Sequence, residues 1–291
     1  MKYSQSIGKK IPLKAGKSGA QVFLTEHETV MKTVRRCEAD EALWNACLRE
    51  ILFYEQNADH SIPFLPQILY TEHTHEQLTL EMRYYRPMNP LTMTREKIMQ
   101  ILSALAQLHS MTPPECLPPP APTLPDSLVL IACADGWKSV FSEHKDLFSA
   151  YQSFPGHAAA AFRKINLNFD LHRTDFCHGD FHIGNILVDD ADKPIFIDFQ
   201  NCSIGDGIGD VSFLHSRLNA DGIALSLEEL MQIYSTCSGI SVSILRLQAA
   251  LANFNTSFLY WHQYLHGSDA DRVQSIFNVM QDDFLLLSSE F

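Results

Sequence analysis

The sequence lacks several features that would assign a class of protein directly. It contains seven cysteines but no CxxC pair, and an odd number of cysteines fits a disulfide framework poorly. The first twelve residues carry lysines without the apolar stretch that a secretory signal needs. No hydrophobic run approaches the length of a membrane span. We therefore expect reduced thiols, a cytoplasmic location and no membrane partner.

Positive charge is also scarce. The chain has 22 lysines and arginines against 34 aspartates and glutamates, which gives a net charge of −12. Proteins that bind nucleic acid through charge usually lean basic, so we expect no nucleic-acid partner. An acidic balance is compatible with a cationic substrate but is also common in cytosolic proteins. Because 46% of the residues are hydrophobic, the chain can bury a sizeable core.

The first 85 residues or so have the pattern of a β-rich lobe with one helix. The segments 20–24 and 29–34 are rich in β-forming residues and flank a polar turn, and 68–71 and 77–83 resemble two further strands. Between these pairs, the segment 38–56 places its apolar residues on one stripe, as an amphipathic helix does.

The rest of the chain, residues 86–291, has mostly helical patterns. Thr94 is suited to cap a helix that stops before Pro113, and the proline-rich segment 113–125 predicts an extended connector. A helix pair is expected over 135–172, two short strands over 186–189 and 194–198, and helices again over 226–291. These patterns predict an α+β chain with two lobes, 1–85 and 86–291.

The segment 176–214 contains the residues that point to chemistry. Asp180 lies in a glycine-flanked loop, and Asn185 follows it at the spacing found in kinase catalytic loops. A predicted hairpin brings Asp198 back beside Asn185. Phosphoryl transfer from ATP needs oxygen ligands for magnesium and a carboxylate near the proton of the acceptor hydroxyl. Asn185 and Asp198 can supply the metal ligands, and Asp180 can supply the base.

This segment resembles the aminoglycoside phosphotransferase and choline kinase-like family, whose fold is protein-kinase-like. Ile183 stands where the family usually has proline, and that position is not a ligand. The residues that carry the resemblance in this segment are His178, Gly179, Asp180, His182, Gly184, Asn185, Ile197, Asp198, Phe199, Gly205, Asp206 and Asp210.

The resemblance extends upstream and implies the roles of further residues. Lys32 is similar to the family's phosphate-binding lysine, and Glu50 would pair with it from the helix. A loop containing Gly16, Ser18 and Gly19 would cover the phosphates. The resemblance thus implies a nucleotide-binding lobe over 1–85 and a catalytic and substrate-binding lobe over 86–291.

The activity implied by the resemblance is that of an ATP- and Mg²⁺-dependent phosphotransferase. It would transfer the γ-phosphate to a hydroxyl group of a small molecule, with amino sugars and amino alcohols among the candidates. The stretch between Asp198 and Asp210 is too short for a clear activation segment, which favours a small-molecule acceptor over a protein. The motif fixes the donor chemistry and leaves the acceptor and the oligomeric state open.

Two other functions stay open at this point. In a metal-dependent hydrolase, His178, Asp180, His182 and Asp198 would bind a transition metal. The glycines around these histidines predict a loop, however, and this interpretation leaves Lys32 without a role. In a non-catalytic nucleotide-binding regulatory module, the same fold would bind ATP without turnover.

Overall fold

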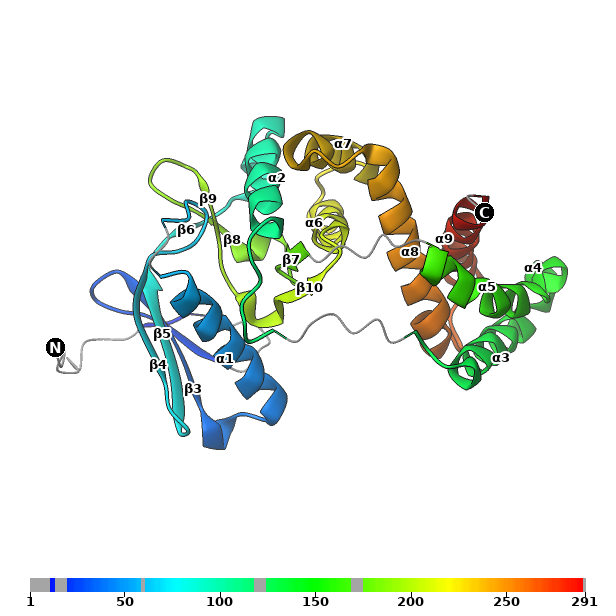
Figure 1. Ribbon diagram of the computed structural model, residues 1–291, viewed down its shortest axis with the longest axis horizontal. Helices are drawn as coiled ribbons and strands as arrows, with labels where there is room; N and C mark the ends of the chain where they lie inside the picture. Colours follow the sequence, from blue (N-terminus) through cyan, green and yellow to red (C-terminus); the bar gives the residue numbers. More distant parts are fainter. Residues whose placement is uncertain (1–10, 14–19, 59–60, 118–123, 169–174, 290–291) are drawn as a thin grey trace. The chain divides into compact units, whose positions relative to one another are not determined.

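The computed structural model describes residues 11–13, 20–58, 61–117, 124–168 and 175–289, which form two compact units (Figure 1). Unit 1 comprises the described residues of 1–119 and 174–238, and unit 2 those of 120–173 and 239–291. The predicted lobes, 1–85 and 86–291, divide the chain at another place than these two units do. The lobe boundary at residue 85 stays a prediction. Among the described helices, none is long and apolar enough to cross a membrane.

Unit 1 begins with an antiparallel five-stranded sheet in the order β1-β2-β3-β5-β4. The register places Lys32 of β3 between Val22 of β2 and Leu80 of β5, so this lysine lies on the central strand of the sheet. The strands are β1 (Ile11–Pro12), β2 (Gln21–Leu24), β3 (Thr29–Arg35), β4 (Ile68–His73) and β5 (Gln77–Arg83).

Helix α1 (Glu41–Gln56) packs against β4 and β5 of this sheet. It follows a 3₁₀ turn, η1 (Arg36–Glu38), and its first turn is capped by Asp40, whose side chain accepts a hydrogen bond from the Leu43 amide at 2.8 Å. The buried residues recur at helical spacing and include Trp44, Cys47, Glu50, Ile51, Phe53 and Tyr54. The predicted helix is confirmed, with a start that this cap sets slightly later.

The rest of unit 1 combines short strands with three helices. One small sheet has the order β6-β8-β9, and a second pairs β7 with β10. Helices α2 and α7 pack together, and α6 packs on α7. The elements are β6 (Arg86–Pro87), η2 (Pro90–Thr92), α2 (Arg95–His109), β7 (Asp175–Cys177), η4 (Ile183–Asn185), β8 (Ile186–Val188), β9 (Pro194–Phe196), η5 (Phe199–Asn201), β10 (Ser203–Gly205), α6 (Ile208–Ala220) and α7 (Leu227–Ser238).

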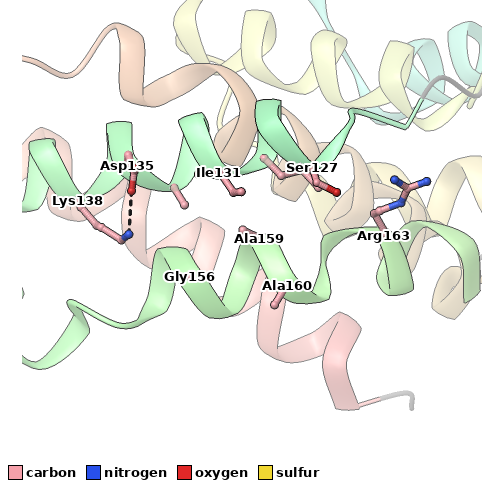
Figure 2. A pocket seen from close by; sticks show the side chains of 10 residues that line it. Ser127, Ile131, Asp135, Lys138, Gly156, Ala159, Ala160 and Arg163 are labelled. Atoms are coloured by element: carbon pink, nitrogen blue, oxygen red, sulfur yellow. Dashed lines mark hydrogen bonds and ion pairs between the residues drawn. The ribbon is translucent and has the colours of Figure 1, made fainter.

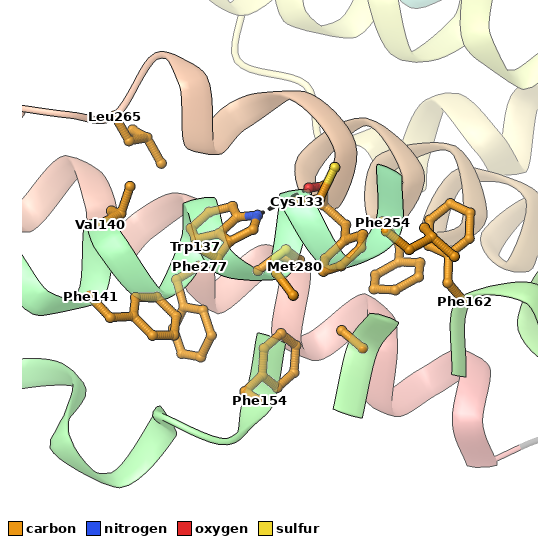
Figure 3. Packing of buried hydrophobic residues seen from close by; sticks show 14 of the residues in the cluster. Cys133, Trp137, Val140, Phe141, Phe154, Phe162, Phe254, Leu265, Phe277 and Met280 are labelled. Carbon is orange, nitrogen blue, oxygen red and sulfur yellow. Dashed lines mark hydrogen bonds between the residues drawn. The ribbon is translucent and has the colours of Figure 1, made fainter. Parts of the chain in front are cut away.

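Unit 2 is helical and has an aromatic core (Figure 3). Phe141 and Phe148 stack with ring centroids 4.6 Å apart, and Phe277 meets both rings edge-on. The Trp137 ring N–H donates to the Phe258 carbonyl at 3.2 Å, so the core leaves this polar group satisfied. The elements are α3 (Ser127–Glu143), α4 (Lys145–Phe148), η3 (Ser149–Tyr151), α5 (Phe154–Asn168), α8 (Val242–Tyr260), η6 (Trp261–Gln263) and α9 (Ala270–Ser289).

A shallow groove runs between α3 and α5 on unit 2 (Figure 2). Gly156, Ala159 and Ala160 give α5 a small-residue face along it, and an exposed Lys138–Asp135 ion pair of 2.8 Å lies at its edge. The groove contains none of the site residues predicted from the sequence.

Two parts of the fold differ from the sequence prediction. Helix α3 begins at Ser127, well before the expected start at 135, because Asp126 caps it by accepting from the Leu128 and Val129 amides. Strands β7 and β10 were not predicted, since three-residue strands are too short to show an alternating pattern. The cap of α2 by Thr94, which accepts from the Lys97 amide, agrees with the prediction.

Candidate active site

Lys32 forms ion pairs with two carboxylates in unit 1. Its Nζ is 2.7 Å from Glu50 Oε2 and 2.8 Å from Asp198 Oδ1. Burial alone would lower the pKa of Lys32, but the carboxylates of Glu50 and Asp198 outweigh burial and hold this pKa above its usual value. Lys32 is therefore a fixed positive charge, held between two acidic side chains from separate parts of the chain.

Glu50 reaches Lys32 from the buried face of α1. Its side chain is only 2% exposed. Burial raises the pKa of Glu50, and the neighbouring Lys32 opposes that shift. A buried carboxylate is costly unless it is paired, so the pair with Lys32 ties α1 to the central strand of the sheet.

Asp198 follows strand β9 in a left-handed backbone conformation, with φ 68° and ψ 58°. Aspartate tolerates this region better than bulkier residues do. The adjacent Ile197 amide donates to the Asn185 carbonyl at 3.0 Å, and the Ile197 carbonyl lies 2.9 Å from His178 Nε2. These bonds fix the end of the hairpin, and the Asp198 side chain stays 32% exposed.

Asp180 and Asn185 are joined directly in the loop between β7 and β8. Asn185 Nδ2 donates to the Asp180 carbonyl at 2.9 Å and to Asp180 Oδ2 at 3.2 Å. Because the amide nitrogen is used in this way, Asn185 Oδ1 is the oxygen left for a cation. Before Asp180, Gly179 has φ +81°, and a Cβ there would lie 2.0 Å from the Asn201 carbonyl oxygen. This loop position needs glycine both for its backbone conformation and for space.

The two histidines of the loop both interact with main-chain groups. His178 is fully buried beside Phe199 with ring centroids 4.6 Å apart, and burial lowers its pKa. His182 Nδ1 accepts from the Gly184 amide at 3.0 Å, while its Nε2 lies 3.7 Å from Asp180 Oδ1. His178 is thus a structural residue, and His182 lies beside the carboxylate of Asp180.

The side chains that cluster closely enough to share a metal ion are not those that the hydrolase interpretation requires. Among the described residues, the His, Cys, Asp and Glu side chains close enough to share a metal ion are His109, Cys177 and Asp210. Neither His178 nor His182 belongs to that group. The geometry therefore gives the hydrolase interpretation no support at the loop for which it was considered.

Asp210 braces the loop from the first turn of α6. Its Oδ2 accepts from the His178 amide at 2.7 Å, and its Oδ1 accepts from the Gly179 amide at 2.9 Å. Burial would raise the pKa of Asp210, but the hydrogen bond from His109 and the nearby histidines outweigh burial and lower this pKa. The carboxylate thereby fixes two consecutive amides immediately before Asp180.

Sequence reasoning missed the groups that hold α1 against the segment after Asp198. Arg49 donates to the Gln200 carbonyl at 3.1 Å, and the Gln200 side chain donates to Cys47 Sγ. The Phe53 and Phe199 rings lie 4.3 Å apart. The apolar stripe predicted for this helix included Tyr54 but not Phe53, and no sequence pattern reveals which ring Phe53 meets.

The three residues predicted to cover the phosphates, Gly16, Ser18 and Gly19, lie outside the described residues. The other predicted site residues all belong to unit 1: Lys32, Glu50, Asp180, Asn185 and Asp198.

The comparison with family models identifies the family to which the chain belongs. The model of the phosphotransferase enzyme family matches residues 11–241. The chain belongs to this family. The matched range contains all five of the described site residues. None of the curated proteins compared with the sequence matches it.

Several solved structures share the fold of this family member. An aminoglycoside 2'-phosphotransferase-IIIa mutant bound to GDP is 13% identical over 97% of this chain and 93% of that chain, with a TM-score of 0.60. The streptomycin–ATP complex of APH(2")-IIa is 12% identical over 94% and 92%, with a TM-score of 0.52. Choline kinase LicA from Streptococcus pneumoniae is 13% identical over 97% and 93%, with a TM-score of 0.52.

These comparisons confirm the expected family and the expected α+β, bilobal protein-kinase-like fold. The chain is a phosphotransferase, as the resemblance implied. Membership of the family supports ATP-dependent transfer to a hydroxyl group of a small molecule.

Proposed function

We propose that this phosphotransferase catalyses the magnesium-dependent transfer of the γ-phosphoryl group of ATP to a hydroxyl group of a small molecule, such as an amino sugar or an amino alcohol. The observation that carries the proposal is the pair of short contacts from Lys32 to Glu50 and Asp198, 2.7 and 2.8 Å long. The solved structures with bound GDP, or with ATP and streptomycin, support a nucleotide donor and a small acceptor.

The side chains proposed to hold magnesium fit that ion chemically. Magnesium prefers oxygen ligands and commonly takes only one or two carboxylates from the protein. Asp198 offers a partly exposed carboxylate, and Asn185 offers its Oδ1 because Asp180 occupies its amide nitrogen. When bound, magnesium would offset the negative charge of the phosphates.

Asp180 would act on the acceptor. Its carboxylate takes the hydroxyl proton while the hydroxyl oxygen attacks the γ-phosphorus, and the bond to the β–γ bridging oxygen breaks to release ADP. The Asn185 amide holds Asp180 Oδ2 at 3.2 Å, which leaves Oδ1, 3.7 Å from His182 Nε2, to accept the proton.

Lys32 would bind phosphate oxygens and is oriented for that purpose by Glu50. Gly16, Ser18 and Gly19 would cover the phosphates through the loop that contains them. A cytoplasmic location and the absence of nucleic-acid and membrane partners are proposals that rest on composition alone. None of the seven cysteines is paired in a disulfide in the structure, and reduced thiols stay an expectation.

The test is phosphorylation of a panel of acceptors by the purified full chain with ATP and magnesium. The panel contains aminoglycosides, a macrolide, choline, ethanolamine, homoserine, thiamine and simple sugars. Mass spectrometry should find one phosphorylated class, and Asp180→Asn should abolish it while the exposed-site control Asp190→Asn should not. Absence of ATP binding by the wild-type chain would overturn the proposal.

A further inference from the structure

We propose that His109 and Tyr234 are positioning residues of the phosphotransfer reaction. Together they orient Asp210 so that its carboxylate fixes the backbone immediately before Asp180. The inference rests on the proposed function for the role of Asp180. It adds two residues, from helices α2 and α7, that lie outside the segment 176–214 identified in the sequence.

The contacts form a continuous chain across three helices. His109 Nε2 lies 3.1 Å from Asp210 Oδ2, and His109 Nδ1 lies 2.6 Å from the Tyr234 hydroxyl. Asp210 then accepts from the amides of His178 and Gly179. His109 is the last residue of α2, Tyr234 lies in α7 and Asp210 lies in α6, so the chain joins elements that are distant in sequence.

Burial makes these contacts strong enough to orient the carboxylate. His109 is 4% exposed, Asp210 3% and Tyr234 1%. Away from water, a polar group that loses its partner is left unsatisfied at a cost in free energy, so each member is held by the next. An ionised Asp210 can only accept, which makes His109 Nε2 the donor and lets Nδ1 accept from the hydroxyl of Tyr234 in the neutral ring.

The backbone nearby leaves space for the His109 ring. A Cβ on Gly207 would lie 2.3 Å from His109 Nδ1, although Gly207 has an ordinary φ of −56°. Glycine at the start of α6 is therefore required by the ring and not by the backbone conformation. Because the ring is held at both nitrogens, it cannot move away to admit a side chain.

The same cluster could be taken for a metal site, since ligand atoms of His109, Cys177 and Asp210 lie within 4.8 Å of one another. Hydrogen bonds already use both nitrogens of His109 and both oxygens of Asp210. Burial raises the pKa of the Cys177 thiol strongly, which disfavours the thiolate that a metal would need. A positioning role fits these contacts better than metal binding.

The expected consequence is specific to the step that uses Asp180. Gly179 adjoins Asp180, so a tilt of its amide rotates the carboxylate away from the acceptor hydroxyl. Lys32, which is proposed to bind the phosphates, and Asp198, which is proposed to hold magnesium, belong to other elements. Loss of the brace should therefore reduce turnover and leave the affinity for ATP unchanged.

The test compares Tyr234→Phe and His109→Gln with the wild-type full chain. Tyr151→Phe in unit 2 is the matched control, because it removes a hydroxyl from a tyrosine packed on Phe277. Hydrogen exchange is measured on the peptide covering 175–182 and, as an internal reference, on β5. The dissociation constant for a fluorescent ATP analogue with magnesium is measured alongside.

We expect about tenfold faster exchange over 175–182 in both variants, with β5 and nucleotide affinity unchanged within twofold. With the acceptor identified from the panel, kcat should fall about tenfold at constant KM for ATP. Adding Tyr234→Phe to Asp210→Asn should cost little more, because both act through the same carboxylate.

Unchanged exchange over 175–182 in both variants would overturn the brace. Faster exchange throughout unit 1 together with weaker ATP binding would also overturn it, because that pattern marks a general loss of stability. The two variants could exchange faster over 175–182 while the wild-type chain phosphorylates no acceptor. That result would leave the brace intact and contradict the proposed function instead.

Discussion

The two units of this phosphotransferase bury different kinds of side chain. In the part of the chain that the structure describes, the buried carboxylates belong to unit 1: Glu50, Asp175 and Asp210. The core of unit 2 is built mainly from phenylalanine rings and aliphatic side chains. Unit 1 therefore bears the desolvation cost of three buried carboxylates, whereas the buried core of unit 2 contains none among the described residues.

This difference indicates what each core contributes. A buried ion pair is weak evidence for stability, because well-packed apolar residues would serve as well or better. Its presence in unit 1 makes sense as a means of fixing the orientation of Lys32, Asp198 and the loop before Asp180. In unit 2, where packing is the main requirement, the core consists of apolar side chains.

The largest expected effect is a loss of turnover on substitution of Asp198 in unit 1. Asp198→Asn keeps the size of the side chain and its tolerance of a left-handed backbone, but it removes the charge proposed to hold magnesium. We expect magnesium-dependent turnover to fall on the order of 10³-fold, measured with the acceptor found in the panel.

The matched control for that prediction is Asp192→Asn. Asp192 also has a positive φ, of 62°, and lies exposed at the tip of the same hairpin. It should keep wild-type turnover. Equal rates for Asp198→Asn and Asp192→Asn would show that the metal assignment is wrong.

The corresponding change in unit 2 should affect stability alone. Phe277 lies against Phe141, Phe148, Tyr151 and Phe154, so Phe277→Ala leaves a large cavity. We expect the free energy of unfolding to fall by about 3–5 kcal/mol in urea titrations. The exposed neighbour Val279→Ala should be nearly neutral. A small effect at Phe277 would contradict the view that unit 2 depends on packing.

Loss of the lysine tests whether the ionic contacts serve catalysis. Lys32→Ala removes the proposed phosphate ligand, and we expect turnover to fall about 10²–10³-fold while the circular dichroism spectrum stays that of a folded chain. Lys97→Ala, which breaks a surface pair with Asp192, is the control. Full activity of Lys32→Ala would mean that another cation binds the phosphates.

The smallest expected effect concerns Asp283 of unit 2, a partly buried carboxylate. Burial and the neighbouring Asp282 raise the pKa of Asp283 to about 7, and its Oδ2 has no hydrogen-bond partner among the described residues. The unfolded carboxyl titrates near 4. Between about pH 4 and pH 7 the folded state thus binds the extra proton, and stability falls as the pH rises.

Asp283→Asn should remove that dependence. Its Tm should exceed the wild-type Tm at pH 8 and match it at pH 4, by differential scanning calorimetry. The exposed control Asp221→Asn in unit 1 should have the wild-type Tm at both pH values. A lower Tm for Asp283→Asn at pH 8 would show that the carboxylate is stabilising in its charged form.

Much of the fold was predictable because its signals are local. The β-forming segments 20–24, 29–34, 68–71 and 77–83 correspond to β2, β3, β4 and β5. The cap at Thr94 marked the start of α2. The late start predicted for the helix at Ser127 shows the limit, since its cap lies directly after a proline-rich segment that dominated the pattern.

The candidate site was predictable where a motif is continuous in the chain. Asp180, Asn185 and Asp198 share one short segment, and the structure brings Asp198 to Lys32, far away in sequence. Their roles stay predictions. His109 and Tyr234 could not be found, because each is a single residue at the end or middle of an ordinary helix and only the packing of α2 on α7 brings them together.

The close approach of Gly207 to His109 has a consequence for how this chain can vary. A methyl group at position 207 and an imidazole at position 109 cannot occupy the same space, so position 207 can accept a larger residue only where position 109 is smaller. In homologues, a larger residue at 207 should accompany a smaller one at 109. Such homologues would have to orient the carboxylate at position 210 by other means.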